Sequence, residues 1–84
     1  MDNRDRALLA QVQELVRQER ALRERLADPA DRHRIDERAA LHDLEEELDQ
    51  CWDLLRQRRA RRTSGGDPDG AQARPVSEVE SYLQ

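Results

Sequence analysis

The stretch from Leu41 to Arg62 reads LHDLEEELDQCWDLLRQRRARR, and it predicts a long helix with two different halves. Apolar residues recur in the first half at alternating spacings of three and four, which is the period of one helix face. They are Leu41, Leu44, Leu48, Cys51 and Leu55. The last seven residues hold five arginines and nothing apolar larger than alanine. The sequence therefore predicts a helix that packs along its first half and carries positive charge at its end.

The composition limits what the rest of the chain can build. Of the 84 residues, 40% are charged, 36% hydrophobic and 2% aromatic, which excludes a large enclosed core. Long amphipathic helices remain feasible, because each needs only one apolar stripe. The net charge of −4 is unevenly spread: residues 31–55 carry −6 and residues 56–62 carry +5. Small domains of this kind often gain stability by oligomerisation.

A second apolar stripe predicts a helix over residues 4–27. Its residues follow heptad spacing and are Leu8, Val12, Leu15, Leu22 and Leu26. Leu9 and Val16 widen the stripe on one side. Glu19 is a polar member, and we expect it at the seam's edge near Arg38 or His42. A metal role is disfavoured, because the Glu-x-x-His pairs of di-iron bundles are missing from the sequence.

The Asp28-Pro29 dipeptide predicts the connection between the two helices, since proline cannot continue a helix. Pro29 suits a first helical position with Asp28 as its cap, so the second helix is expected over residues 29–62. A short link between two long helices favours an antiparallel hairpin.

The hairpin predicts a register between the two stripes. Folding at the turn places Leu15 opposite Leu44, and Leu26 opposite the region of Ile35. The second helix is longer than the first. The arginine run is therefore expected to project beyond the hairpin, or to meet something other than the first helix.

The C-terminal part is predicted to be a linker followed by a short helix. Residues 63–75 contain three glycines and two prolines, a composition typical of a flexible linker. In residues 76–84, Ser77 and Glu80 have the spacing of a capping box. The residues available to dock this segment are Val76, Val79, Tyr82 and Leu83. Nine residues do not hold a helix alone, so the tail either folds back on its own hairpin or is recognised by another protein.

The width of the apolar stripe is the strongest functional signal. A two-helix hairpin buries one seam, and further apolar residues beside it would form the kind of patch that marks an interface. We expect a homodimer of hairpins forming a four-helix bundle; the alternative is that the tail covers the patch. The candidate interface residues are Leu8, Leu9, Val12, Val16, Leu48, Cys51, Trp52 and Leu55. Trp52 is the expected anchor, with core filling as the alternative.

The arginine run supports a second hypothesis, a weak association with nucleic acid through phosphate charge. The candidate anion-binding residues are Arg56, Arg58, Arg59, Arg61 and Arg62. The acidic balance of the whole chain and the lack of an aromatic residue within the run disfavour nucleic acid as a partner. The simpler interpretation is that these arginines complement the helix dipole and pair with acids, for example those of residues 37–49 in a partner chain.

The sequence lacks the motifs of catalytic, cofactor-binding and metal-binding sites. The sequence contains no nucleophile–base pair or glycine-rich phosphate loop, so we expect no enzymatic activity and no cofactor or metal. Cys51 is the only cysteine and is expected to be a small buried hydrophobe. His33 and His42 are expected on solvated helix positions. No apolar run has the length of a membrane span or a signal peptide, which predicts a cytoplasmic protein without a membrane partner.

Two segments, LDQCWDLLRQRRARR (Leu48–Arg62) and RPVSEVESYLQ (Arg74–Gln84), resemble a family of small actinobacterial proteins catalogued only as a domain of unknown function. LVRQERALRER (Leu15–Arg25) is similar to that family's first helix, although a more acidic version with a histidine near Arg20 is expected there. The turn over residues 27–32 is where the family varies. The resemblance covers most of the chain and implies a small cytoplasmic helical hairpin of an actinobacterium. The resemblance implies no activity, cofactor or partner. It indicates that the C-terminal tail, residues 76–84, is important, because a dispensable end would not be expected to look typical of the family.

Overall fold

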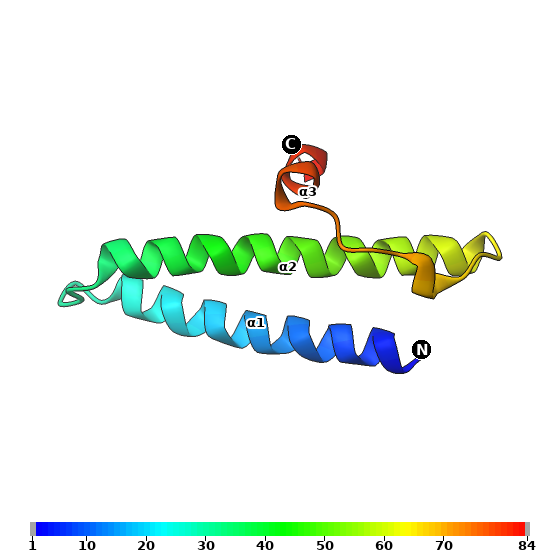
Figure 1. Cartoon of the computed structure of the whole chain (residues 1–84). Helices are drawn as coiled ribbons and strands as arrows, with labels where there is room; N and C mark the ends of the chain where they lie inside the picture. Colours follow the sequence, from blue (N-terminus) through cyan, green and yellow to red (C-terminus); the bar gives the residue numbers. More distant parts are fainter. Residues whose placement is uncertain (1, 84) are drawn as a thin grey trace.

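Two long antiparallel helices and one short helix make up the fold. The structure is a computed structural model that describes residues 2–83, with side chains described for residues 2–80. Helix α1 spans Asn3–Ala27, α2 spans Arg34–Thr63 and α3 spans Val76–Leu83, with a 3-10 turn, η1, at Pro68–Gly70. α1 lies along one side of α2, and α3 lies on the opposite side (Figure 1). The predicted all-α hairpin with a short C-terminal helix is confirmed.

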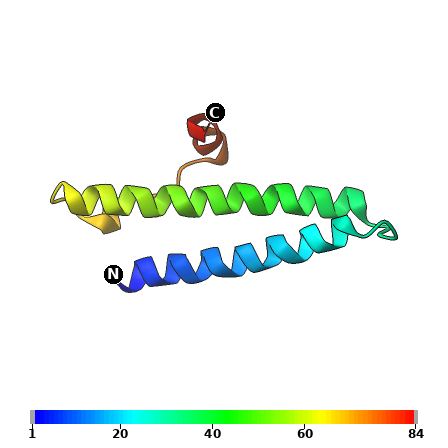
Figure 2. The ribbon, with the colours of Figure 1, turned by 180° about the vertical axis from the view of Figure 1, so that it is seen from behind.

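The molecule is thin, with dimensions of 53 × 26 × 14 Å. Figures 1 and 2 view it from opposite sides, and in neither view does α3 cross the seam between α1 and α2. Protein domains are usually built from at least two packed layers that share a core. The hairpin supplies one such layer, and its flanks are open to solvent.

The seam between α1 and α2 is apolar at its centre. Val12 and Leu15 of α1 pack with Leu48 and Cys51 of α2 in one buried cluster. Three half-buried residues complete it, and these are Val16, Leu44 and Leu55. Full burial of a leucine or valine contributes about 1.5–3 kcal/mol. Leu15 and Leu44, predicted to lie opposite each other, belong to the same cluster, and the predicted burial of Cys51 is confirmed.

The turn differs from the prediction, because α2 begins at Arg34 rather than at Pro29. The two aspartates of the loop bind backbone N–H groups two residues further on, which holds the chain in a turn. Asp28 Oδ1 accepts a hydrogen bond from the Ala30 N–H at 2.9 Å, and Asp31 Oδ1 accepts one from the His33 N–H at 3.0 Å. Ile35, which was predicted to face Leu26, is 85% exposed as a result.

The end of α2 turns the chain back on itself. Gly65 has a φ of +81°, and the Gly65 and Gly66 N–H groups bind the carbonyls of Arg62 and Arg61. This is the Schellman arrangement, in which a left-handed glycine satisfies the last free carbonyls of a helix. Residues 64–75, here called the return segment, then run back along α2 (Figure 1). The stretch predicted as a linker is thus laid against the helix.

The return segment is fixed to α2 by side chains that α2 supplies. Gln57 Nε2 donates to the Gln72 carbonyl at 2.8 Å, and Gln50 Nε2 donates to the Arg74 carbonyl at 3.1 Å. α3 follows, and its Val79 is only 1% exposed. The tail therefore docks on its own hairpin. The side chains of Tyr82 and Leu83, also predicted to dock, lie outside those that the structure describes.

Candidate interaction face

A groove runs along the flank of α1 and is closed on one side by Trp52 of α2. Its volume is about 640 Å³. It is lined by Leu9, Val12, Gln13, Val16, Arg17, Arg20, Ala21, Glu24 and Trp52, here called the groove face. Leu9 and Val16 are one heptad apart, so they lie on the same side of α1. This is the widened part of the apolar stripe that the sequence indicated.

Trp52 is an exposed large hydrophobic residue of the groove face. Its side chain is 44% exposed, although it follows directly after buried Cys51. Core filling, the alternative interpretation of Trp52, is therefore excluded for the single chain. A large aromatic that keeps nearly half of its surface in contact with water is typical of a binding surface.

The tail does not cover the groove. α3 contacts α2 alone, and no residue of the described part of the tail lines the groove. The sequence left open whether the tail covers the apolar patch of Leu9, Val16 and Trp52. The alternative that the tail covers this patch is wrong, because α3 docks on the side of α2 that faces away from the groove.

Ion pairs form along α1, and Arg17, which lines the groove, takes part in one of them. Arg17 donates to both oxygens of Glu14, at 2.9 and 2.6 Å, and Gln18 donates to the same carboxylate at 3.0 Å. These hydrogen bonds, first those from Arg17, lower the pKa of Glu14 to about 2. Arg23 bridges Glu45 of α2 at 2.8 Å and Glu19 at 3.8 Å. Glu19 thus lies at the edge of the seam but pairs with Arg23, whereas it was predicted near Arg38 or His42.

The eight interface candidates fall into three groups. Val12, Leu48 and Cys51 are buried in the seam, so they hold the hairpin together. Leu9, Val16, Leu55 and Trp52 lie on the side of the groove, where Leu55 joins Leu9 in a neighbouring hollow near the open end. Leu8 lies on the opposite flank, beside Leu54 and Ala73.

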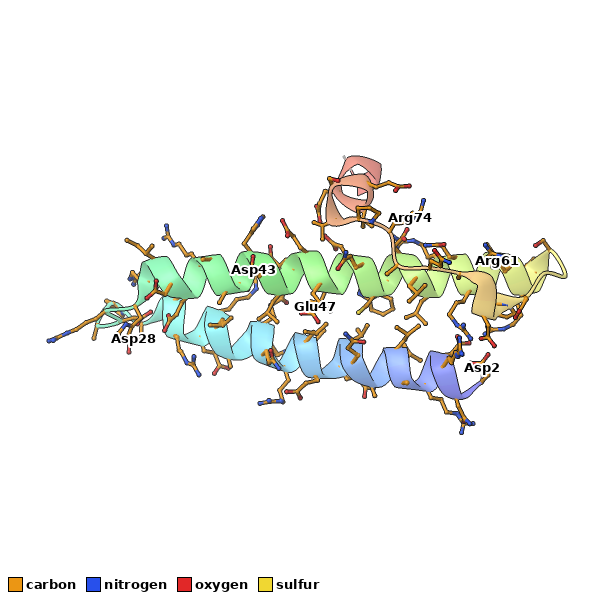
Figure 3. All side chains as sticks on the ribbon, in the orientation of Figure 1. Asp2, Asp28, Asp43, Glu47, Arg61 and Arg74 are labelled. Carbon is orange, nitrogen blue, oxygen red and sulfur yellow. The ribbon has the colours of Figure 1, made fainter. Side chains whose placement is uncertain are left out.

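The arginine run meets the start of α1 instead of projecting beyond it. Arg58 is 3% exposed, and its Nε donates to Asp5 Oδ1 at 2.7 Å. Its Nη2 donates to the Asp2 carboxylate at 2.9 Å, and its Nη1 donates to Asp69 at 3.1 Å. Arg62 also pairs with Asp2 and Asp5. Figure 3 shows Asp2 at this open end, beside the last turns of α2.

This open-end cluster, defined by Asp2, Asp5, Arg58, Arg62 and Asp69, was missed in the sequence. The hydrogen bond from Arg58 lowers the pKa of Asp5, followed by the effect of Arg62. A hydrogen bond from the Asp5 N–H lowers the pKa of Asp2, and the two arginine charges add to it. These pairs use the two arginines internally, so Arg58 is unavailable for the anion binding that the sequence suggested.

A signal for this cluster was present in the heptad pattern. Asp5 is seven residues before Val12, and Arg58 is seven residues after Cys51. The seam therefore continues to the open end at the same heptad positions, with a charged pair in place of an apolar one. The other three arginines of the run, Arg56, Arg59 and Arg61, are exposed.

The described part of the chain contains no group of three or more histidine, cysteine, aspartate or glutamate side chains placed as metal ligands would be. No helix of residues 2–83 is both long and apolar enough to cross a bilayer.

Comparison with known proteins agrees with the resemblance found in the two sequence segments. The family model described as "Protein of unknown function (DUF2630)" matches residues 4–84. An uncharacterised protein of Mycobacterium bovis and two of Mycobacterium tuberculosis are each 49% identical over 82 residues, covering 93% of this chain and 88% of each relative. No solved structure matches the chain. The predicted similarity to an actinobacterial family of unknown function is confirmed.

Proposed function

We propose that this chain, which belongs to the DUF2630 family of proteins of unknown function, is a non-enzymatic interaction module that self-associates through its groove face. The observation that carries the proposal is the exposure of Trp52 beside Leu9 and Val16. A soluble monomer gains nothing from keeping these residues in water, whereas a second copy would bury all three. The cytoplasm is the proposed compartment, since a single unpaired cysteine suits a reducing environment.

A second hairpin is the occupant that the groove fits best. Two hairpins packed face to face form a four-helix bundle, in which each seam gains a second apolar layer. Most soluble homo-oligomers are closed by a two-fold axis, so the same patch must serve both copies. The groove rim carries both signs of charge, with Arg20 and Glu24 one helical turn apart. Two copies can therefore place opposite charges against each other.

The rim supports such an interface in a second way. Arg17 and Arg23 already pair with Glu14 and Glu45 within the chain. Covering Arg17 and Arg23 therefore leaves neither arginine without a partner, which would otherwise oppose association. Trp52 would then act as the central anchor and the ion pairs as the polar rim, the usual arrangement of protein interfaces.

The test compares Trp52→Ala with Ile35→Ala by sedimentation equilibrium. Ile35 is the matched control, because it is a large exposed apolar residue of the same helix but lies outside the groove face. We expect Trp52→Ala to weaken dimerisation at least tenfold, while Ile35→Ala leaves it unchanged. Circular dichroism of both variants should match the wild type. Equal dimerisation of the two variants would contradict the role assigned to Trp52.

A second candidate function rests on the exposure of Arg56, Arg59 and Arg61. These three residues offer weak, sequence-independent contact with the phosphates of a nucleic acid. A titration with a fluorescent oligonucleotide at several salt concentrations tests this candidate. Phosphate contact predicts an affinity that falls steeply with salt, and replacing the three arginines with glutamine should abolish it. Dimerisation through apolar surface should hardly respond to salt.

A further inference from the structure

Contacts of different kinds hold α3 on α2, among the side chains that the structure describes up to residue 80. Val79 is buried, and Arg74, at the end of the return segment, pairs with Asp53 of α2, which is 1% exposed. Figure 3 shows Arg74 beside α3, where the return segment passes over α2. An isolated helix of eight residues is unstable in water. The folding of α3 therefore depends on these contacts.

One contact of α3 opposes its docking. Glu80 faces the carboxylate of Asp49 on α2, and its Oε1 is buried without a hydrogen-bond donor. Glu46 adds a further negative charge from α2, while His42, at 2.7 Å from Glu46, offsets it in part. On the α3 side, Glu78 faces Arg74 at 3.7 Å and lies in a more exposed position. Two ionised carboxylates in contact repel each other, whereas a proton shared between them forms a hydrogen bond.

Docking therefore perturbs two acids in opposite directions. Contact with Asp49, followed by burial, raises the pKa of Glu80 above its usual 4.5. The hydrogen bond from Arg74, followed by that from Gln57, lowers the pKa of Asp53 below its usual 3.8. Asp53 must be ionised for its pair with Arg74, while the Glu80 contact requires a proton.

We propose that α3 is a proton-controlled clasp, in which a proton held between Glu80 and Asp49 tightens α3 on α2 and its loss loosens α3. The sign follows from linkage. The docked state binds this proton more tightly than the undocked state, so docking is strongest at low pH and weakens as the pH rises through the raised pKa of Glu80. As the pH falls through the lowered pKa of Asp53, the Arg74 pair is lost and docking weakens again. The clasp is therefore tightest between these two pKa values.

The experiment follows α3 by NMR in the full-length wild-type chain. The Val79 methyl groups report docking, because Val79 is buried only when α3 is in place. The Leu48 methyl groups in the seam report whether the hairpin itself stays folded. Each pKa unit by which docking raises the pKa of Glu80 corresponds to a tenfold change in the ratio of docked to undocked α3. We expect that ratio to fall as the pH rises above the ordinary glutamate value of 4.5, while the Leu48 signals stay constant.

Three variants separate this proposal from a general effect of charge. Glu80→Gln supplies an amide that can donate to Asp49, so α3 should stay docked as the pH rises above 4.5 and should lose this response to pH. Asp49→Asn should do the same from the other side. Glu78→Gln is the matched control, because it removes one charge of α3 away from Asp49; its response to pH should persist.

The outcomes are decisive in either direction. A docked fraction that does not change with pH in the wild type would overturn the proposal. So would a Glu80→Gln variant in which α3 loosens with rising pH as it does in the wild type. Loss of the response in Glu78→Gln but not in Glu80→Gln would show that Glu78, and not Glu80, controls docking, which would also overturn the proposal. None of these results bears on dimerisation, which depends on the groove face on the other side of α2.

Discussion

Different interactions act on the two sides of α2: apolar packing toward α1, and largely ion pairs and hydrogen bonds toward the return segment and α3. Toward α1, the contact is a long apolar seam centred on Val12, Leu15, Leu48 and Cys51. Toward the return segment and α3, the described side chains up to residue 80 include buried Val79, the Asp53–Arg74 pair and hydrogen bonds from Gln50 and Gln57. Apolar contact depends on area and hardly on pH, whereas the polar side depends on the ionisation of a few groups.

This difference indicates which side sets the fold and which side can be adjusted. α1 has 25 residues and α3 has 8, so far more surface is buried on the α1 side. The α1 side should fail only when its core is damaged. The α3 side should respond to single protons and to single hydrogen bonds.

The largest effect is expected from Leu48→Asp, which places a charge in the middle of the seam. Removing a buried leucine side chain alone costs about 2–5 kcal/mol, and an unpaired buried charge adds to this. Circular dichroism should show loss of most of the helical signal. Ile35→Asp, at an exposed position of the same helix, should leave the signal intact. Unchanged helicity in Leu48→Asp would contradict the assignment of the seam.

The next effect concerns the open-end cluster, where the α1 side becomes polar. Replacing Arg58 with methionine keeps most of the side-chain volume but leaves Asp5 buried without its main partner. We expect the Tm to fall by several degrees, with helicity retained at low temperature. Arg59→Met is the control, because Arg59 is exposed and should have little effect. A Tm equal to that of the control would show that the cluster does not stabilise the hairpin.

A smaller effect is expected from deleting Val76–Gln84. The hairpin should remain helical, and only the contribution of α3 to the circular dichroism signal should disappear. This follows because the seam residues Val12 and Leu48 make no use of the tail. Collapse of the whole helical signal would mean that both sides of α2 are needed for the fold.

A fourth prediction is that the open-end cluster loses its contribution to stability at acid pH. The pKa values of Asp2 and Asp5 are lowered in the folded chain, so their contribution is complete above the ordinary aspartate value of 3.8. It is lost as the pH falls through the lowered values. Thermal unfolding should therefore show a Tm that drops in this acid range. The drop should be smaller in Arg58→Met; an equal drop would place the acid sensitivity elsewhere.

The smallest effect is expected at Glu14. Its carboxylate should titrate near pH 2 in an NMR experiment, because Arg17 and Gln18 both donate to it. The pair is solvent-exposed, and such pairs contribute little to stability. Glu14→Gln should therefore leave the Tm almost unchanged. A large fall in Tm would show that the groove rim contributes more to the fold than its exposure suggests.

The seam could be predicted because apolar spacing carries it directly. The alternation of three and four residues predicted both helices, the hairpin and the apolar cluster that contains Leu15 and Leu44. The turn could not be placed as well, because Asp28 and Asp31 bind backbone groups of the loop, and this competes with the capping role assumed for Asp28. The later start of α2 then leaves Ile35 in solvent.

The polar contacts were harder to predict for a physical reason. An ion pair such as Asp5 with Arg58 joins residues far apart in the sequence and has no period of its own. It becomes visible only when the heptad of Val12 and Cys51 is continued into charged residues. The groove face was predicted in part, through Leu9, Val16 and Trp52. The position at which α3 docks on α2 could not be predicted, because it depends on the return segment, which carries no apolar pattern.

We propose that two copies of this chain associate through the groove face, and sedimentation equilibrium of the full-length wild-type chain across a concentration series measures this association. A mass that rises to that of two chains, and that is insensitive to salt, is the predicted result. A mass that stays at that of one chain, 9.8 kDa, at every concentration would contradict it. In that case the groove face of Leu9, Val16 and Trp52 does not pair with a second copy.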